Sequence, residues 1–189
     1  MNGLIIRLFF GQLLMLSFGC VHSSKEPQTA FNRTVPLQRN FFLISKAIKE
    51  CLLHKYPDFE IVKKEEYSRL FWDFYDATLI PNECSTDINN DQIIDYALLV
   101  KQKNNLKLAI VFSTPKGYSY WVAPFSFESV NVNGVNFCLA IKPAGRTDVV
   151  KKVPESLVIR KNGFLIKNLE QDYMVFYQAN GKIMTFKMF

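Results

Sequence analysis

Three Asn-Gly pairs in the C-terminal half of the chain constrain its fold more than any other feature of the sequence. Asparagine and glycine both tolerate the positive φ that a type I′ turn requires, so an Asn-Gly pair between two strand-like runs predicts a β-hairpin. The pairs are Asn133-Gly134, Asn162-Gly163 and Asn180-Gly181. They are predicted to join strand 127–132 to 135–141, strand 157–161 to 164–167, and strand 173–178 to 182–186. We therefore expect this half of the chain to form an antiparallel meander.

The N-terminal half predicts two helices. Residues 41–56 place apolar side chains at three- and four-residue intervals, and Pro57 ends the pattern. Residues 63–76 carry a stripe of large apolar side chains at helical spacing, which predicts a core-facing helix: Tyr67, Leu70, Phe71, Phe74 and Tyr75. The predicted fold class is therefore α+β, with N-terminal helices packed on one face of an antiparallel β-meander.

Residues 93–101 form a nearly continuous apolar run, which predicts a central strand buried on both faces. Residues 106–112 alternate apolar and polar side chains, and Pro115-Lys116-Gly117 provides a turn before a further strand at 118–122. A short strand is also expected at 59–62. The middle of the chain is thus predicted to be part of a sheet.

Residues 87–95, which lead into the central strand, carry oxygen-bearing side chains at a spacing typical of calcium loops. Calcium takes six to eight oxygen ligands from side chains, backbone carbonyls and water. Carboxylates gathered this closely repel one another unless a cation neutralises them. Gln92 replaces the usual glycine and Leu98 the bidentate glutamate of an EF-hand, so a helix–loop–helix sensor is not expected. The alternative is a solvated turn whose Asp and Asn side chains cap the backbone. The predicted ligands are Asp87, Asn89, Asp91, the carbonyl of Ile93, and Asp95.

This loop, followed directly by a strand, resembles the Asp-x-Asn-x-Asp-x-x-x-Asp loops of FG-GAP (integrin-type) repeats and of related bacterial secreted proteins. The resemblance covers residues 85–100, and the predicted C-terminal hairpin shows a weaker similarity. It implies a calcium loop and says little about activity. Because the motif occurs in one copy, a propeller is not implied.

The first nineteen residues predict a secretory signal, with Arg7 followed by a short apolar core. Leu16-Ser17-Phe18-Gly19-Cys20 resembles a bacterial lipoprotein processing site, which implies that Cys20 is acylated; ordinary cleavage after Gly19 or near Ser23 is the alternative. Residues 20–39 are polar, contain two prolines and predict a flexible tether before a single domain at 40–189. The expected location is the periplasm or outer envelope as a lipoprotein, or the exterior as a secreted protein.

Three cysteines, Cys51, Cys84 and Cys138, lie in the predicted domain at 40–189. An oxidising export route favours a disulfide, and Cys51–Cys84 would join the first predicted helix to the start of the Asp-rich loop. Cys138 alternates with apolar neighbours in a strand, which predicts a buried free thiol.

No catalytic constellation is apparent in the sequence. A cysteine nucleophile would need a histidine partner, and the chain offers only His22 and His54. The net charge of +6 is spread over the chain rather than clustered, so a nucleic-acid groove is not predicted. We expect a non-enzymatic envelope protein with calcium as a structural clip and a protein partner. The alternative is an inhibitor or immunity-type protein that blocks a secreted enzyme, with the basic stretch 142–152 as its contact loop.

Overall fold

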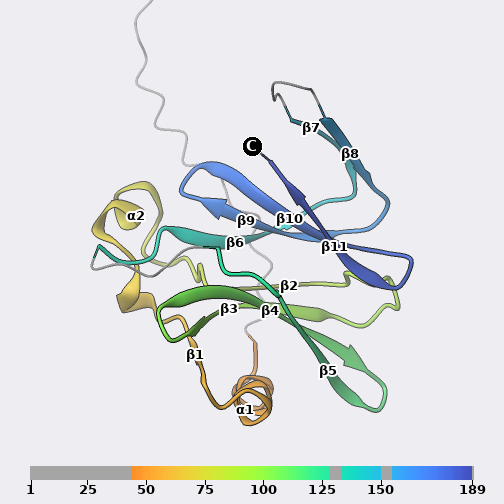
Figure 1. Ribbon diagram of the computed structural model, residues 1–189, viewed down its shortest axis with the longest axis horizontal. Helices are drawn as coiled ribbons and strands as arrows, with labels where there is room; N and C mark the ends of the chain where they lie inside the picture. The colour runs from red at the N-terminus through yellow and green to blue at the C-terminus, as the bar shows by residue number, and fades with distance from the viewer. Residues whose placement is uncertain (1–43, 128–132, 150–154, 189) are drawn as a thin grey trace, which may run out of the picture. The chain divides into compact units, whose positions relative to one another are not determined.

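The computed structural model describes residues 44–127, 133–149 and 155–188 (Figure 1). These residues belong to the unit Thr34–Phe189. The predicted signal peptide, the acylation site at Cys20, the tether and most of the predicted strand 127–132 lie outside them.

Antiparallel strands, not helices, dominate the described residues, with 51% strand and 14% helix. The predicted α+β class was therefore wrong, and the fold is mostly antiparallel β with two short α-helices. Helix α1 (Lys46–Lys55) begins at Ser45, whose side chain accepts a hydrogen bond from the Ile48 amide. It ends before Pro57, so it spans 10 residues.

The second predicted helix is interrupted because Tyr67 takes an extended conformation and forms a parallel bridge with Val135. A short 3₁₀ turn, η1 (Lys64–Glu66), precedes it. Helix α2 (Arg69–Phe74) then starts anew, with the Ser68 hydroxyl accepting from the Phe71 amide. Only part of the predicted aromatic stripe is buried. Tyr67 and Phe71 lie in the core, whereas Leu70 and Phe74 are 49% and 41% exposed.

The first sheet contains five strands and is centred on β3 (Asp95–Gln102). β4 (Asn105–Thr114) occupies one edge of β3, and β5 (Gly117–Val122) pairs with the other edge of β4. β1 (Phe59–Ile61) and β2 (Glu83–Thr86) pair with different halves of β3. The predicted central strand is confirmed, and all pairings in this sheet are antiparallel.

The second sheet has the order β11-β10-β9-β6. Its strands are β6 (Phe137–Lys142), β9 (Gly163–Asn168), β10 (Gln171–Ala179) and β11 (Lys182–Lys187). The hairpin predicted at Asn180-Gly181 is confirmed, with φ of 51° at Asn180 and 72° at Gly181. The two sheets and the position of α1 are visible in Figure 1.

The prediction that Asn162-Gly163 joins two paired strands of a hairpin was wrong. β8 (Glu155–Ile159) pairs with β7 (Gly145–Val149), and β9 pairs instead with β6 and β10. Leu157 and Ile159 of β8 pack against Leu165 and Val175 of the second sheet. Burial of these side chains across the sheet face therefore outweighs the turn signal. Part of the stretch predicted as a basic loop forms strand β7.

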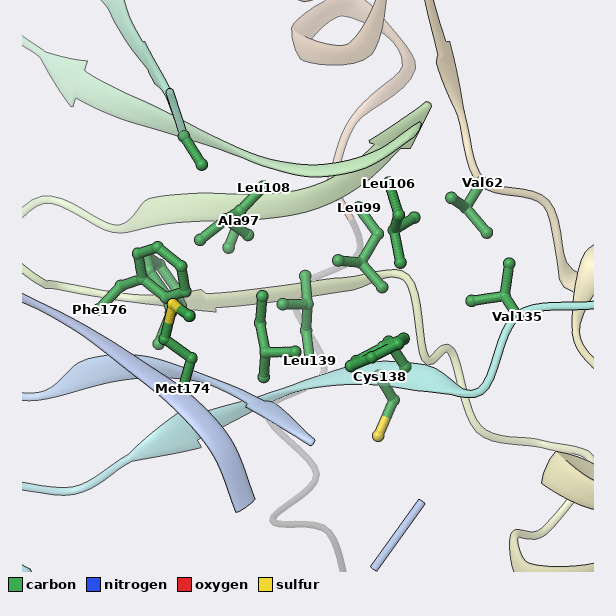
Figure 2. Packing of buried hydrophobic residues seen from close by; sticks show 14 of the residues in the cluster. Val62, Ala97, Leu99, Leu106, Leu108, Val135, Cys138, Leu139, Met174 and Phe176 are labelled. Atoms are coloured by element: carbon green, nitrogen blue, oxygen red, sulfur yellow. The ribbon is translucent and has the colours of Figure 1, made fainter. Parts of the chain in front are cut away.

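The main core lies between the two sheets (Figure 2). Ala97 and Leu99 of β3 face it, together with Leu139 of β6 and Phe176 of β10. The intervening β3 residues point to the opposite face, where Leu98 and Val100 pack with Leu52 of α1. This alternation explains why the central strand reads as a continuous apolar run.

The two sheets meet along one side of the core. The Leu139 amide of β6 donates to the Pro81 carbonyl just before β2, at 2.8 Å. Cys84 of β2 lies beside β6, with its Sγ 3.7 Å from the Ala140 carbonyl oxygen. On this side the edge of each sheet is therefore covered by the other.

An ion pair fastens α1 to the first sheet. Lys49 Nζ lies 2.6 Å from the carboxylate of Glu83, a buried residue of β2. Removing the ammonium leaves a buried carboxylate without its counter-charge, so we expect Lys49→Met to lower the free energy of unfolding by about 2 kcal/mol. Lys46→Met on the same helix breaks an exposed pair with Glu50 and should cost less than about 0.5 kcal/mol. Urea unfolding measures both, and equal losses would contradict the assignment.

Candidate functional site

Two places carry candidate functional residues: the loop between β2 and β3, and the outer edge of β5. The β2–β3 loop contains the predicted calcium ligands. Its backbone turns through positive φ at Asn90 (63°) and at Gln92 (70°). Gln92 thus takes the conformation usually given to glycine at that position, which costs roughly 1 kcal/mol.

Asp87 organises the loop through hydrogen bonds from the backbone. Its carboxylate accepts from the amides of Asn90, Asp91 and Gln92. The Asn89 side-chain oxygen accepts from the Asp91 amide at 2.9 Å, and an Asp91 oxygen accepts from the Ile93 amide at 2.9 Å. These are successive Asx turns, the arrangement of the predicted alternative to calcium.

Asp95 is fully buried at the base of the loop. Its two oxygens accept from the Ile88 amide at 3.2 Å and from the Ser113 amide of β4 at 3.0 Å. Burial raises the pKa of the Asp95 carboxyl to about 6, and the charges of Asp91 and Asp87 add to this, while the two amide hydrogen bonds oppose it. Asp95 therefore ties the loop to the end of β4.

The turn between β8 and β9 also holds the loop. Lys161 Nζ donates to the Asn89 carbonyl at 2.6 Å, and the side-chain amide nitrogen of Asn162 donates to the Thr86 hydroxyl at 3.1 Å. Sequence reasoning missed both contacts because they join residues more than 70 positions apart. No local pattern signals them, since they depend on how the two sheets pack.

The predicted ligands fit a cation only in part. Asp87, Asn89 and Asp91 line the loop, whereas the Asp95 carboxylate is directed at two backbone amides. Within residues 44–127, 133–149 and 155–188, no group of three or more His, Cys, Asp or Glu side chains is arranged to hold a metal ion. The loop in this conformation is thus closed by hydrogen bonds and is not a preformed cage.

The second place is the outer edge of β5. The Ala123 amide bonds to the Leu108 carbonyl, in register with the β4–β5 pairing. Because antiparallel strands alternate hydrogen-bonded and non-bonded pairs, the backbone groups of Tyr118, Tyr120 and Val122 point away from β4. No backbone partner for these groups occurs among the residues that the structure describes. We call these three residues the β5 edge.

Two of the three residues of the β5 edge carry aromatic side chains. Tyr118 is 45% exposed. Tyr120 is half-buried and lies edge-on to Tyr56, with ring centroids 6.5 Å apart. Tyrosine is enriched at protein interfaces because it combines a large apolar ring with a polar hydroxyl. The β5 edge thus combines unpaired backbone with exposed aromatic surface.

The predicted Cys51–Cys84 disulfide is not present, because Cys51, Cys84 and Cys138 are all free thiols. Cys51 is exposed on α1, whereas Cys84 pairs with Ala97, whose side chain faces the core between the sheets. The first sheet therefore separates the two sulfurs. Cys138 is buried and free, as predicted.

Compared with protein-family models, with curated proteins and with solved structures, the chain matches none of them. None of these comparisons supports the resemblance of the β2–β3 loop to FG-GAP loops. Among the described residues, no helix is long and apolar enough to cross a membrane.

Proposed function

We propose that this chain is an exported, non-enzymatic protein of the cell envelope that binds a protein partner through the β5 edge. The signal-like N-terminus and the lipoprotein-like sequence at Cys20 support export. The observation that carries the proposed binding role is the unpaired backbone of β5 beside the exposed Tyr118. An extended, uncovered strand edge is a template for pairing with another chain.

Site-specific photo-crosslinking tests this role in the intact exported protein. A photoreactive amino acid at Tyr118 should give a discrete adduct with one protein in the native envelope. The same probe at Leu70 of α2, which is 49% exposed, is the matched control and should give none. An adduct of equal yield from both positions, or none from Tyr118, would overturn the proposal.

Calcium in the β2–β3 loop is the second part of the proposal. The spacing of Asp87, Asn89 and Asp91 and the positive φ at Gln92 support it. Bound calcium would stabilise the native state by mass action, so the melting temperature should rise in millimolar calcium relative to chelator. Asp91→Ala should abolish that rise, whereas Asp148→Ala, an exposed acid on β7, should leave it unchanged. Identical melting temperatures for wild type in calcium and in chelator would exclude the ion.

An inhibitor of a secreted enzyme is the second candidate. The observation that favours it is the β7–β8 hairpin, whose Val158 is 65% exposed opposite Arg146. Recovery of one stoichiometric hydrolase with wild-type protein, and its loss with Val158→Asp, would favour this candidate over binding at the β5 edge.

A further inference from the structure

We infer that the β5 edge receives an extended, acidic segment of the partner protein, which adds to the first sheet as a further strand. This inference rests on the proposed function and names the partner's chemistry. It is carried by the edge itself, by its difference from the other edges, and by the charges beside it.

The other strand edges of the five-stranded and four-stranded sheets carry features that discourage pairing. β1 has three residues, and β2 lies against β6. β11 begins with Lys182 and ends with Lys187, and lysines at an edge oppose the approach of another strand. β5 has the sequence Gly-Tyr-Ser-Tyr-Trp-Val, with no charged residue and no proline. Of these edges, β5 is therefore the one suited to accept a strand.

Two lysines beside β5 favour an acidic occupant. Lys116 is exposed in the turn that leads into β5. Lys55 is exposed on α1 one helical turn after Cys51, whose side chain contacts Tyr120, so both residues lie on the same face of the helix. Neither lysine has an ion-pair partner among the described residues, whereas Glu50 and Glu83 are already paired with lysines of α1. Carboxylates on an added strand would complement these free ammonium groups.

The same charges argue against a second copy of this chain. A two-fold pairing centred on Tyr120 would place Tyr120 beside its own symmetry mate. Because Lys55 lies one helical turn after Cys51, which contacts Tyr120, this pairing would bring the two copies of Lys55 to the same face of the joint sheet, where like charges repel. An acidic foreign strand removes this repulsion.

A displayed library of random peptides, selected on the full chain, tests the inference. We expect enrichment of sequences rich in Asp and Glu that alternate with apolar residues. Synthetic versions should slow amide hydrogen exchange at Tyr118, Tyr120 and Val122. Lys55→Glu with Lys116→Glu should remove the acidic preference while binding to uncharged extended peptides persists.

Two proline variants supply the matched control. Tyr118→Pro removes an outward-facing amide from β5 and should weaken peptide binding about tenfold, the equivalent of one lost backbone pairing. The hydrogen bond from the Met188 amide to the Tyr173 carbonyl fixes the pattern of the β10–β11 pairing, so the Thr185 amide points away from β10. Thr185→Pro removes this outward-facing amide from β11 and should change peptide binding less than about twofold.

Each of three results would overturn the inference. The first is that the selected peptides show no enrichment of Asp and Glu, and the second is that the two proline variants lose peptide binding equally. The third is that the wild type self-associates and thereby protects the amides of Tyr118, Tyr120 and Val122 from exchange. A specific photo-adduct from Tyr118 together with no acidic preference would leave the proposed function standing while the inference fails. Loss of that adduct as well would remove both.

Discussion

Replacing Phe176 with alanine is expected to lower the free energy of unfolding by about 3–5 kcal/mol, a large fraction of the roughly 5–15 kcal/mol by which an ordinary domain is stable. Phe176 of β10 is fully buried between the two sheets. Its ring lies 5.9 Å from the centroids of both Trp121 and Phe127, and 6.3 Å from that of Phe125. Truncation would leave a cavity lined by these rings, which the strands on either side cannot collapse to fill.

Phe74→Ala is the matched control for this prediction. Phe74 is the same residue type but is 41% exposed on α2, so its loss should cost less than about 1 kcal/mol. Denaturant unfolding followed by tryptophan fluorescence measures both variants. A loss at Phe176 no larger than that at Phe74 would mean that the two sheets do not share the core described.

The second large effect is a pH dependence that comes from Asp95. Its pKa of about 6 in the folded protein lies above the ordinary value of 3.8, so the folded state holds this proton more tightly than the unfolded state. The contribution of Asp95 to stability is therefore fully present below about pH 4 and is lost as the pH rises through about 6. A shift of roughly two pKa units corresponds to 2–3 kcal/mol, at about 1.4 kcal/mol per unit.

Asp95→Asn removes this titration while keeping the size of the side chain. In chelator, the stability difference between wild type and Asp95→Asn should move in favour of wild type by about 2–3 kcal/mol between pH 7 and pH 4. Thermal or urea unfolding at several pH values measures it. A stability difference that is constant with pH, or that changes in the opposite direction, would show that burial does not raise the pKa of Asp95.

The parts of the fold that sequence predicted are those set by local chemistry. The apolar run at β3 identified a strand buried on both faces because each face meets its own apolar layer. Asn180-Gly181 predicted its hairpin because nothing competes with the turn. Asn162-Gly163 did not, because Leu157 and Ile159 gain more by packing across the second sheet. The α+β class failed because helical spacing at 63–76 could not reveal that Tyr67 pairs with Val135.

The candidate site shows the same division. The residues of the β2–β3 loop were located from their spacing, and Gln92 takes the positive φ that the position demands. The direction of the Asp95 carboxylate was not predictable, since it depends on Ser113 in a strand that follows later in the chain. The β5 edge was invisible in sequence because an edge is defined by which strands fail to pair, and that is a property of the whole sheet.

Amide hydrogen exchange along β5, measured on the isolated full-length chain, tests the central claim most directly. An open edge predicts fast exchange at Tyr118, Tyr120 and Val122, alternating with slow exchange at Ser119 and Trp121, whose amides face β4. Uniformly slow exchange across Gly117–Val122 would show that this edge is already covered, and would contradict the proposal that it is available to a partner.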